Sequence, residues 1–240
     1  MELLLIIPFF NEGFRMDESS LTEMFTHYRS TGFLLVNDGS TDGTRALLDK
    51  FAGRHPNVRA LHLAKNSGKA EAIRQGVIST TISDYRYIGY MDADLATPGS
   101  ELLLIKEFAV KNPIFTLVMG SRIKRLGSEI VRYGYRHYAG RVFATITSQL
   151  ILKVPVYDTQ CGAKVIESGL ALELFQEPFI TKWLFDVELL LRLKAKDKNL
   201  QGVYEYPLNN WIEKGNSKIK LKELLSFPYQ LLKIYFAYGH

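Results

Sequence analysis

Short apolar runs alternate with longer amphipathic stretches throughout the first half of the chain. Apolar runs bounded by Gly, Asn and Asp are typical of strands, and apolar residues at helical spacing predict helices. The strands predicted in this way cover residues 3–7, 33–37, 58–63, 85–91 and 115–120, and the helices cover 20–29, 44–53, 67–78 and 100–110. This alternation predicts an α/β fold in which a mostly parallel sheet carries helices on both faces.

The second half of the chain is less regular. The pattern predicts a Tyr- and Arg-rich helical region over 132–152, a short helix near Ala171, a helix over 185–195 and a pair of strands between Val203 and Trp211. A final amphipathic stretch closes the chain. We expect one domain, 1–240, in which the half 123–240 elaborates the sheet-forming half 1–122.

The composition supports a folded globular chain. With 240 residues and 47% hydrophobic content, the chain can bury a full core. A single cysteine, Cys161, excludes an internal disulfide framework and fits a reducing compartment. The first apolar run continues into Pro8 without a basic leader, which predicts a buried strand rather than a signal peptide. We therefore expect a cytoplasmic location, and the apolar stretch 224–238, interrupted by Pro228 and Lys233, is too short to span a membrane.

Positive charge is concentrated in one segment. Residues 120–153 hold seven lysines and arginines and a single acid, Glu129. A cationic segment of this kind favours phosphates, anionic lipid or nucleic acid, although a solvated face would give the same pattern. Because tyrosines alternate with the arginines here, we favour a membrane interface and predict no nucleic-acid partner.

Polar clusters follow each of the five predicted strands. In chain order they are Asn11-Glu12, Asp38 to Gly43, Lys65-Asn66, Asp92 with Asp94, and Gly120-Ser121-Arg122. Ligands of open α/β sheets bind beyond the carboxyl ends of the strands. We therefore expect these clusters to form one site along a single edge of the sheet.

Asp92 and Asp94 provide the strongest chemical signal in that site. Hard cations prefer carboxylate oxygens and complete their coordination with water and substrate phosphates, so this pair predicts an Mg²⁺ or Mn²⁺ site beside a nucleotide diphosphate. An isolated Asp-x-Asp is more often a solvated turn. The joint placement of the clusters favours the metal site, with Arg122 available to neutralise phosphate charge.

The chain resembles the family 2 glycosyltransferases of the GT-A (Rossmann-like) fold, and within them the group that glycosylates polyprenyl or dolichyl phosphate. The motifs that carry this resemblance lie at 8–12, 37–43, 66–69, 91–98, 120–122, 158–162, 185–190 and 215–218. They cover nearly the whole chain in family order. The resemblance implies a hexosyltransferase that moves a hexose from a nucleotide diphosphate sugar to a lipid phosphate with inversion.

The resemblance also implies roles for individual residues. The nucleotide sugar would be contacted by Pro8, Asn11, Glu12, Asp38, Lys69 and Asp92, and the metal would be held by Asp92 and Asp94. The catalytic side chains would be Arg122, Asp158 and Asp186, with Arg136 and Lys218 binding substrate on the acceptor side. A lipid monophosphate, with a second pKa near 6, is already an anion at neutral pH. Such an acceptor needs cations that position it more than it needs a general base.

Two positions depart from the family pattern. Asn37 stands where the family commonly has a first aspartate, so Asp38 alone inherits the nucleoside-binding role. Asn216 separates Gly215 from Ser217, which shifts the register of Lys218 but keeps its cation available. The residues around Asp92 and Asp158 resemble the glucosyl branch and imply UDP-glucose, with GDP-mannose as the alternative donor.

Other functions share parts of this pattern. A soluble family 2 enzyme with a glycan acceptor would have the same donor site, and a nucleotide-sugar sensor could use the same fold without turnover. A sugar nucleotidyltransferase would need a Gly-rich basic loop after the first strand, which 8–13 lacks. The basic and apolar residues of 218–236 predict an interfacial helix on the cytoplasmic face of a membrane, with core packing or a homo-oligomer contact as alternatives.

Overall fold

The structure is a computed structural model that describes residues 1–81, 84–132, 134–214 and 221–238, with the backbone alone for 134–139 and 221–225. Its elements are β1 (Leu3–Phe9), α1 (Glu18–His27), β2 (Thr31–Asn37), α2 (Thr44–Arg54), β3 (Val58–His62), α3 (Lys69–Ile78), β4 (Tyr87–Tyr90), α4 (Gly99–Lys111), β5 (Leu117–Ser121), β6 (Glu129–Val131), α5 (Gly134–Ile146), η2 (Thr147–Leu152), β7 (Lys164–Glu167), α6 (Ser168–Leu174), α7 (Phe185–Lys194), β8 (Val203–Pro207), β9 (Asn210–Ile212) and α8 (Leu221–Tyr238). The η2 segment is a π-helical turn that continues α5.

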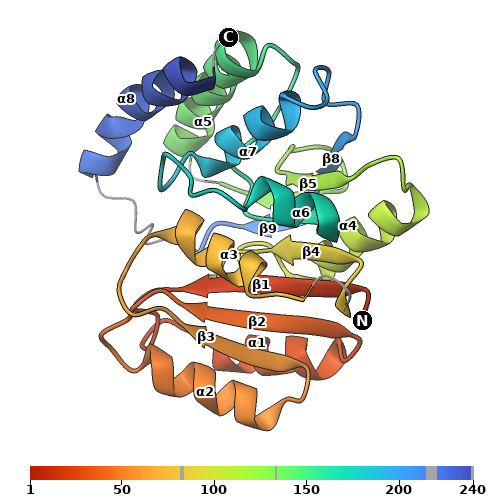
Figure 1. The fold of residues 1–240 in the computed structure, drawn as a ribbon, viewed down its shortest axis with the longest axis vertical. Helices are drawn as coiled ribbons and strands as arrows, with labels where there is room; N and C mark the ends of the chain where they lie inside the picture. Colours follow the sequence, from red (N-terminus) through yellow and green to blue (C-terminus); the bar gives the residue numbers. More distant parts are fainter. Residues whose placement is uncertain (82–83, 133, 215–220, 239–240) are drawn as a thin grey trace.

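A seven-stranded sheet in the order β3-β2-β1-β4-β7-β5-β8 organises the molecule (Figure 1). Every neighbouring pair runs parallel except those of β7, which lies antiparallel between β4 and β5. The fold is therefore α/β with a mostly parallel sheet, as the alternating pattern predicts. The strands β7 and β8 come from the second half of the chain and extend the sheet built by the first half.

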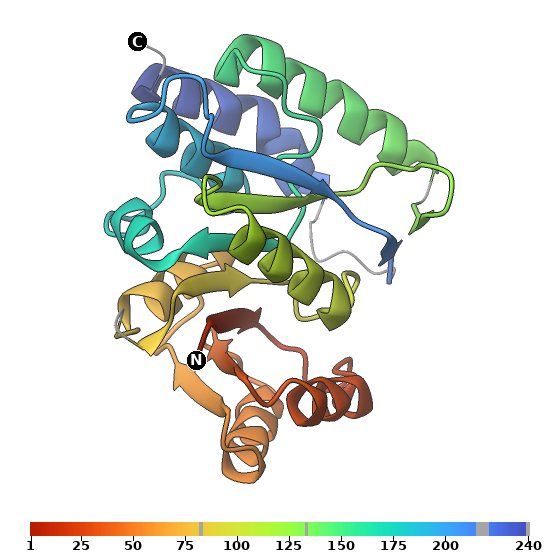
Figure 2. The same cartoon turned by 90° about the vertical axis from the view of Figure 1, so that its right-hand side faces the viewer.

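Helices cover both faces of the sheet because its central strands are apolar on both sides (Figure 2). Successive residues of β1 point to opposite faces. Leu4 and Ile6 join the core cluster that packs under α3, α6 and α7, while Leu5 and Ile7 join the cluster that packs under α1, α2 and α4. Two hydrophobic cores thus hold the sheet rigidly and leave its carboxyl edge free to carry loops.

Three features of the second half differ from the sequence-based expectation. The strands β6 and β7 were not predicted, since each has only two consecutive apolar residues next to charged ones. The expected pair of strands near 203–211 exists as β8 and β9, but the two do not pair with each other. Instead β8 joins the main sheet beside β5, and β9 pairs in parallel with β6 in a separate two-stranded sheet.

The helix α8 lies against α7 and η2 at one end of the molecule, and Pro228 stands inside it (Figure 1). The rings of Phe143 on α5 and Phe227 on α8 lie 6.0 Å apart, so the two helices share an apolar contact. Within the described ranges, none of the helices combines the length and the apolar character that crossing a membrane requires.

Candidate active site

The carboxyl ends of β1, β2 and β4 meet at one edge of the sheet, where their arrowheads point in Figure 1. The loops that follow these strands are therefore neighbours, although they are far apart in sequence. The predicted polar clusters belong to these loops.

The first three loops are tied to one another by hydrogen bonds. Asp38 is buried, and its two carboxylate oxygens accept from the backbone N–H groups of Ser67 and Gly68, each at 2.8 Å. Asn11, in the left-handed region with φ 48°, accepts from the N–H of Thr41 at 2.9 Å through its side-chain oxygen. Predicted ligand-binding residues thus also fix the shape of the loops, which preorganises this part of the site.

Gly39 shows how closely these loops approach. Its φ of 64° lies in the left-handed region that glycine adopts at little cost. A Cβ at this position would collide with the backbone of Lys65 and Asn66. The loop after β2 therefore passes directly over the loop after β3.

Asp92 and Asp94 lie in the loop after β4, and Lys69 at the start of α3 forms an ion pair with Asp92. Although desolvation opposes it, the charge of Lys69 lowers the pKa of Asp92 below its usual value. Partial desolvation between the neighbouring loops and the negative charge of Asp92 raise the pKa of Asp94. Two carboxylates that repel each other in this way provide favourable ligands for a divalent cation.

The carboxylates of Asp92 and Asp94 are the side-chain oxygens in this loop that fit a divalent cation. Among the side chains that the structure describes, no group of three or more His, Cys, Asp or Glu residues is arranged to hold a metal ion. Asp94 uses one oxygen to accept from the N–H of Ala96 at 3.0 Å, which orients its carboxylate. Two oxygen ligands from the protein suit Mg²⁺ or Mn²⁺ in a site that substrate phosphates and water complete.

A second charged cluster joins the end of β5 to the loop 158–162. Asp158, 6% exposed, accepts from Arg122 Nε at 2.6 Å and from Arg122 Nη2 at 2.7 Å. Arg132 Nη2 reaches the same carboxylate at 3.4 Å. Burial alone would raise the pKa of Asp158, but the charge and hydrogen bonds of Arg122 hold it well below its usual range. The carboxylate therefore stays ionised and keeps both guanidinium groups in place.

Two residues that the sequence analysis did not single out support this cluster. Glu205 on β8 accepts from the N–H groups of Tyr157 and Asp158 at 2.7 and 2.8 Å. The ring of Trp211 on β9 lies 5.2 Å from Arg122 Cζ and 5.4 Å from Arg132 Cζ. A tryptophan face attracts cations, so Trp211 holds the two like-charged guanidinium groups close together. Neither role has a local sequence signal, because both depend on strands from the far end of the chain.

Asp186 lies beneath the site. It is 2% exposed, and one of its oxygens accepts from the hydroxyl of Tyr90 at 2.6 Å and pairs with Lys164 Nζ at 2.8 Å. Lys164, on β7, is another residue that the sequence analysis missed. Its only local signal is a lysine within the otherwise apolar run of a strand. The predicted contact of Asp186 with the sugar stays a prediction.

The structure brings the loop after β4 and the Asp158 cluster together at Gly162. A Cβ at Gly162 would collide with the Asp92 carboxylate, so the loop 158–162 touches the loop that carries Asp92 and Asp94. Pro8 and Glu12 lie half-buried in and after β1, near the loops described above. The side chain of Arg136 and all of Lys218 lie outside the described residues. Hydrogen bonds and ion pairs connect Asp38 to the start of α3, Lys69 to Asp92, and Asp158 to Arg122.

The strand order and the charged loops at the carboxyl edge define a protein of the GT-A fold. A crystal structure of glucosyl-3-phosphoglycerate synthase from Mycobacterium tuberculosis in complex with phosphoglyceric acid superimposes with a TM-score of 0.72 at 16% identity, covering 98% of this chain and 79% of that chain. The same enzyme in complex with Mn²⁺, UDP and glucosyl-3-phosphoglycerate gives a TM-score of 0.72 at 15% identity, with the same coverage of both chains. At these identities the likeness establishes the fold alone.

The chain belongs to Glycosyl transferase family 2, whose sequence profile matches residues 4–166. A dolichyl-phosphate beta-glucosyltransferase of Trichomonas vaginalis is 33% identical over an alignment of 216 positions, and the match covers 86% of this chain and 60% of that protein. A dolichyl-phosphate beta-glucosyltransferase of Dictyostelium discoideum is 27% identical over an alignment of 254 positions, gaps included, and the match covers 98% of this chain and 74% of that protein. The chain thus spans three fifths to three quarters of the length of these relatives.

Proposed function

We propose that this chain transfers glucose from UDP-glucose to the phosphate of a polyprenyl lipid such as dolichyl phosphate, with inversion and with a divalent metal. The observation that carries the proposal is the contact between Gly162 and Asp92. This contact sets Asp92 and Asp94 directly beside the two arginines that contact Asp158. A transferase whose donor and acceptor are both anionic needs a metal site for one and a cationic site for the other, side by side.

The acceptor side fits a phosphate better than a sugar hydroxyl. A hydroxyl acceptor normally needs a general base, and a carboxylate with a strongly lowered pKa is a poor proton acceptor. Asp158 has its pKa held low by Arg122 and is therefore better suited to positioning cations than to removing a proton. Arg122 and Arg132 offer planar donors that match phosphate oxygens. A phosphate anion that already carries negative charge needs only to be held in line with the sugar.

The donor side fits a nucleotide diphosphate. The metal, bound by Asp92 and Asp94, would offset the charge that develops on the departing diphosphate. Lys69 supplies a further cation next to Asp92. Support for UDP-glucose comes from the relatives named as glucosyltransferases and from the structural neighbour crystallised with Mn²⁺ and UDP. In this proposal residues 1–122 form the nucleotide-sugar half, and residues 123–240 form the acceptor half.

The direct test is product formation from labelled donor. We expect the full chain with Mn²⁺, labelled UDP-glucose and dolichyl phosphate to yield a labelled, chloroform-soluble glucosyl phospholipid. The anomeric configuration of the product, measured by NMR, should be β. Labelled GDP-mannose should give little product under the same conditions. Preferred transfer from GDP-mannose, or transfer only to a water-soluble acceptor, would contradict the proposal.

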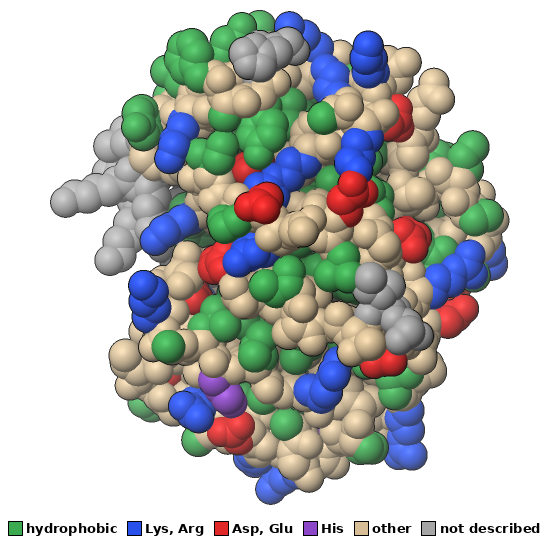
Figure 3. Space-filling model, viewed as in Figure 1, with side chains coloured by type: hydrophobic (Ala, Val, Ile, Leu, Met, Phe, Trp, Pro, Cys, Tyr) green, Lys and Arg blue, Asp and Glu red, His purple; other side chains and the backbone are tan. Residues whose placement is uncertain are grey.

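We also propose that α8 and α5 with η2 bring the chain to a membrane surface as a peripheral protein. Apolar side chains are exposed on α5, η2 and α8. In Figure 3 hydrophobic side chains, drawn green, gather at the upper left, where α8 lies in Figure 1. These exposed residues are Val142, Ile146 and Leu150 on α5 and η2, and Tyr229, Leu232, Tyr235 and Phe236 on α8. Such a surface suits the water-lipid interface and would place the site next to its lipid acceptor.

Vesicle flotation tests the membrane proposal. Replacing Leu232 and Phe236 together by serine should lower binding to vesicles with anionic lipid by about tenfold or more, because two exposed apolar side chains no longer enter the interface. The matched control is Ile114→Ser, which removes an apolar side chain of similar exposure (74%) between α4 and β5. Equal flotation of the double variant and wild type would count against this surface.

A further inference from the structure

Lys164 is a fully buried lysine that the proposed chemistry does not use. It lies at the start of β7 with 0% exposure, and an isolated buried ammonium group is strongly disfavoured. Its Nζ lies 2.7 Å from the carbonyl of Cys161, 3.2 Å from the carbonyl of Thr159 and 2.8 Å from Asp186 Oδ1. All three donors of the ammonium group therefore have partners.

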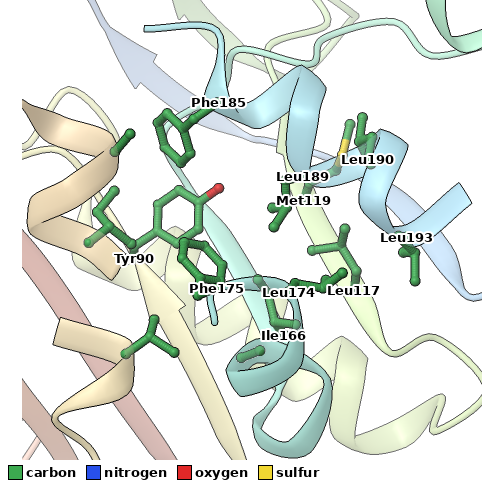
Figure 4. Packing of buried hydrophobic residues seen from close by; sticks show 14 of the residues in the cluster. Tyr90, Leu117, Met119, Ile166, Leu174, Phe175, Phe185, Leu189, Leu190 and Leu193 are labelled. Carbon is green, nitrogen blue, oxygen red and sulfur yellow. The ribbon is translucent and has the colours of Figure 1, made fainter. Parts of the chain in front are cut away.

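These partners belong to different parts of the site. The carbonyl groups of Thr159 and Cys161 lie in the loop that begins with Asp158 and ends with Gly162. Asp186 stands in the first turn of α7 and also accepts from the hydroxyl of Tyr90, the last residue of β4. The Tyr90 hydroxyl points toward α7 from among buried aromatic and aliphatic side chains (Figure 4). A rigid chain of contacts thus runs from β4 through Asp186 and Lys164 to the loop 158–162.

Both ends of this chain lie next to the proposed chemistry. Tyr90 is two residues before Asp92, and the loop 158–162 presents Asp158 to the two arginines. Asp92 is held separately by its ion pair with Lys69. Loss of Lys164 would therefore release the acceptor-side loop while leaving the donor-side carboxylate paired.

We propose that Lys164 is a positioning residue that sets the distance and orientation of the loop 158–162 relative to the carboxylates of Asp92 and Asp94. It touches no substrate and acts through Thr159, Cys161 and Asp186. The inference rests on the proposed function, because alignment of two substrates is what the spacing would serve. A displacement of about 1 Å between reacting groups can lower turnover about 100-fold.

The test compares Lys164→Met with Glu188→Gln as a matched control. Glu188 is also 0% exposed on α7 and pairs with Arg192 at 2.8 Å, but its partners lie away from the loop 158–162. Lys164→Met should lower kcat for transfer about 100-fold, with the KM for UDP-glucose changed less than about threefold. Glu188→Gln should lower Tm while keeping kcat within about threefold of wild type.

A second variant covers the case in which Lys164→Met does not fold. Lys164→Arg keeps the positive charge but cannot place its donors where the ammonium group does, so it should fold and still lose turnover. Hydrogen exchange of the amides of 159–162, measured without substrate, should be faster in both Lys164 variants and unchanged in Glu188→Gln.

The outcomes separate the inference from the proposed function. Wild-type kcat in a Lys164 variant, or unchanged exchange of 159–162, would overturn the positioning role. An equal loss of donor affinity and kcat would also overturn it, since that result would place Lys164 on the donor side. Absence of lipid glucosylation by the wild-type chain would instead contradict the proposed function. In that case hydrogen exchange of 159–162 would still test whether Lys164 holds this loop in place.

Discussion

Replacing Asp94 by asparagine should lower kcat about 100-fold to 1,000-fold, the range found when a group that stabilises developing charge is removed. Asparagine keeps an oxygen that can accept from the N–H of Ala96, so the loop should keep its shape. The variant loses the negative charge that the proposed metal needs as a ligand. Turnover should be measured with saturating Mn²⁺, and folding should be checked by thermal unfolding.

The control for this prediction is a carboxylate outside the site. Asp49 on α2 is exposed and pairs with His62, so Asp49→Asn removes the same charge without touching the proposed metal ligands. We expect wild-type turnover from the control. Both variants should stay within about 0.5 kcal/mol of the wild-type free energy of unfolding, as is usual for exposed positions. A folded Asp94→Asn enzyme with normal turnover in excess Mn²⁺ would exclude Asp94 as a metal ligand.

Replacing Arg122 by alanine should abolish detectable transfer and destabilise the protein by about 3 kcal/mol. The substitution removes both side-chain hydrogen bonds to Asp158 and leaves that carboxylate in a mostly buried position, with the backbone N–H of residue 122 at 3.1 Å and Arg132 at 3.4 Å as its remaining partners at this end of β5. Breaking one partner of a buried ion pair costs far more than the pair contributes, because the remaining charge stays desolvated. Urea unfolding and lipid glucosylation should be measured on the same preparation.

The double variant Arg122→Ala with Asp158→Ala separates stability from activity. Removing the stranded carboxylate should recover at least about 1 kcal/mol of the lost stability, since the desolvated charge is gone. Activity should not return, because the cation that would bind phosphate is still absent. Recovery of transfer in the double variant would show that Arg122 serves only to neutralise Asp158.

The same pair predicts a pH dependence of stability. In the wild type the pKa of Asp158 lies below its unfolded value near 3.9, so its contribution to stability is present above that value and lost as the pH falls further. In Arg122→Ala the burial of Asp158 is largely uncompensated, and protonation at low pH relieves this cost. The difference in unfolding free energy between wild type and variant should therefore begin to shrink as the pH falls toward about 4, where the variant's carboxyl takes up a proton, and shrink further below about pH 4, where the wild type loses its own contribution.

Much of the fold was predictable because it depends on local patterns. The continuous apolar run of β1 and the amphipathic pattern of α4 identify a strand buried on both faces and a helix covering the sheet. The helix bounds differ from the prediction by only a few residues, as at α1, where Asp17 caps the N-terminus. The short strands β6 and β7 were missed, because each has only two consecutive apolar residues next to a charged one, which is too little pattern to identify a strand.

The residues of the candidate site were also only partly predictable from the sequence. The Asp92 and Asp94 loop and Arg122 were identifiable because each directly follows a recognisable strand. Glu205, Trp211 and Lys164 were not, because each acts on a partner brought near by strand pairing. Asp38 was assigned to the nucleoside, and the structure adds that its carboxylate holds the loop at Ser67 and Gly68. That second role depends on how the loops after β2 and β3 cross.

By itself, the sequence determined the α/β class, the order of its strong elements, the polar clusters after each strand and the family. These are properties of hydrophobic periodicity and of residue type at strand ends, which are encoded locally. Only the tertiary structure decided that β7 inserts antiparallel between β4 and β5. That insertion sets Gly162 against Asp92, Asp158 against Arg122 and Lys164 against Asp186. Strand pairing depends on backbone hydrogen bonds between distant segments, and no local pattern of side chains specifies which segments meet.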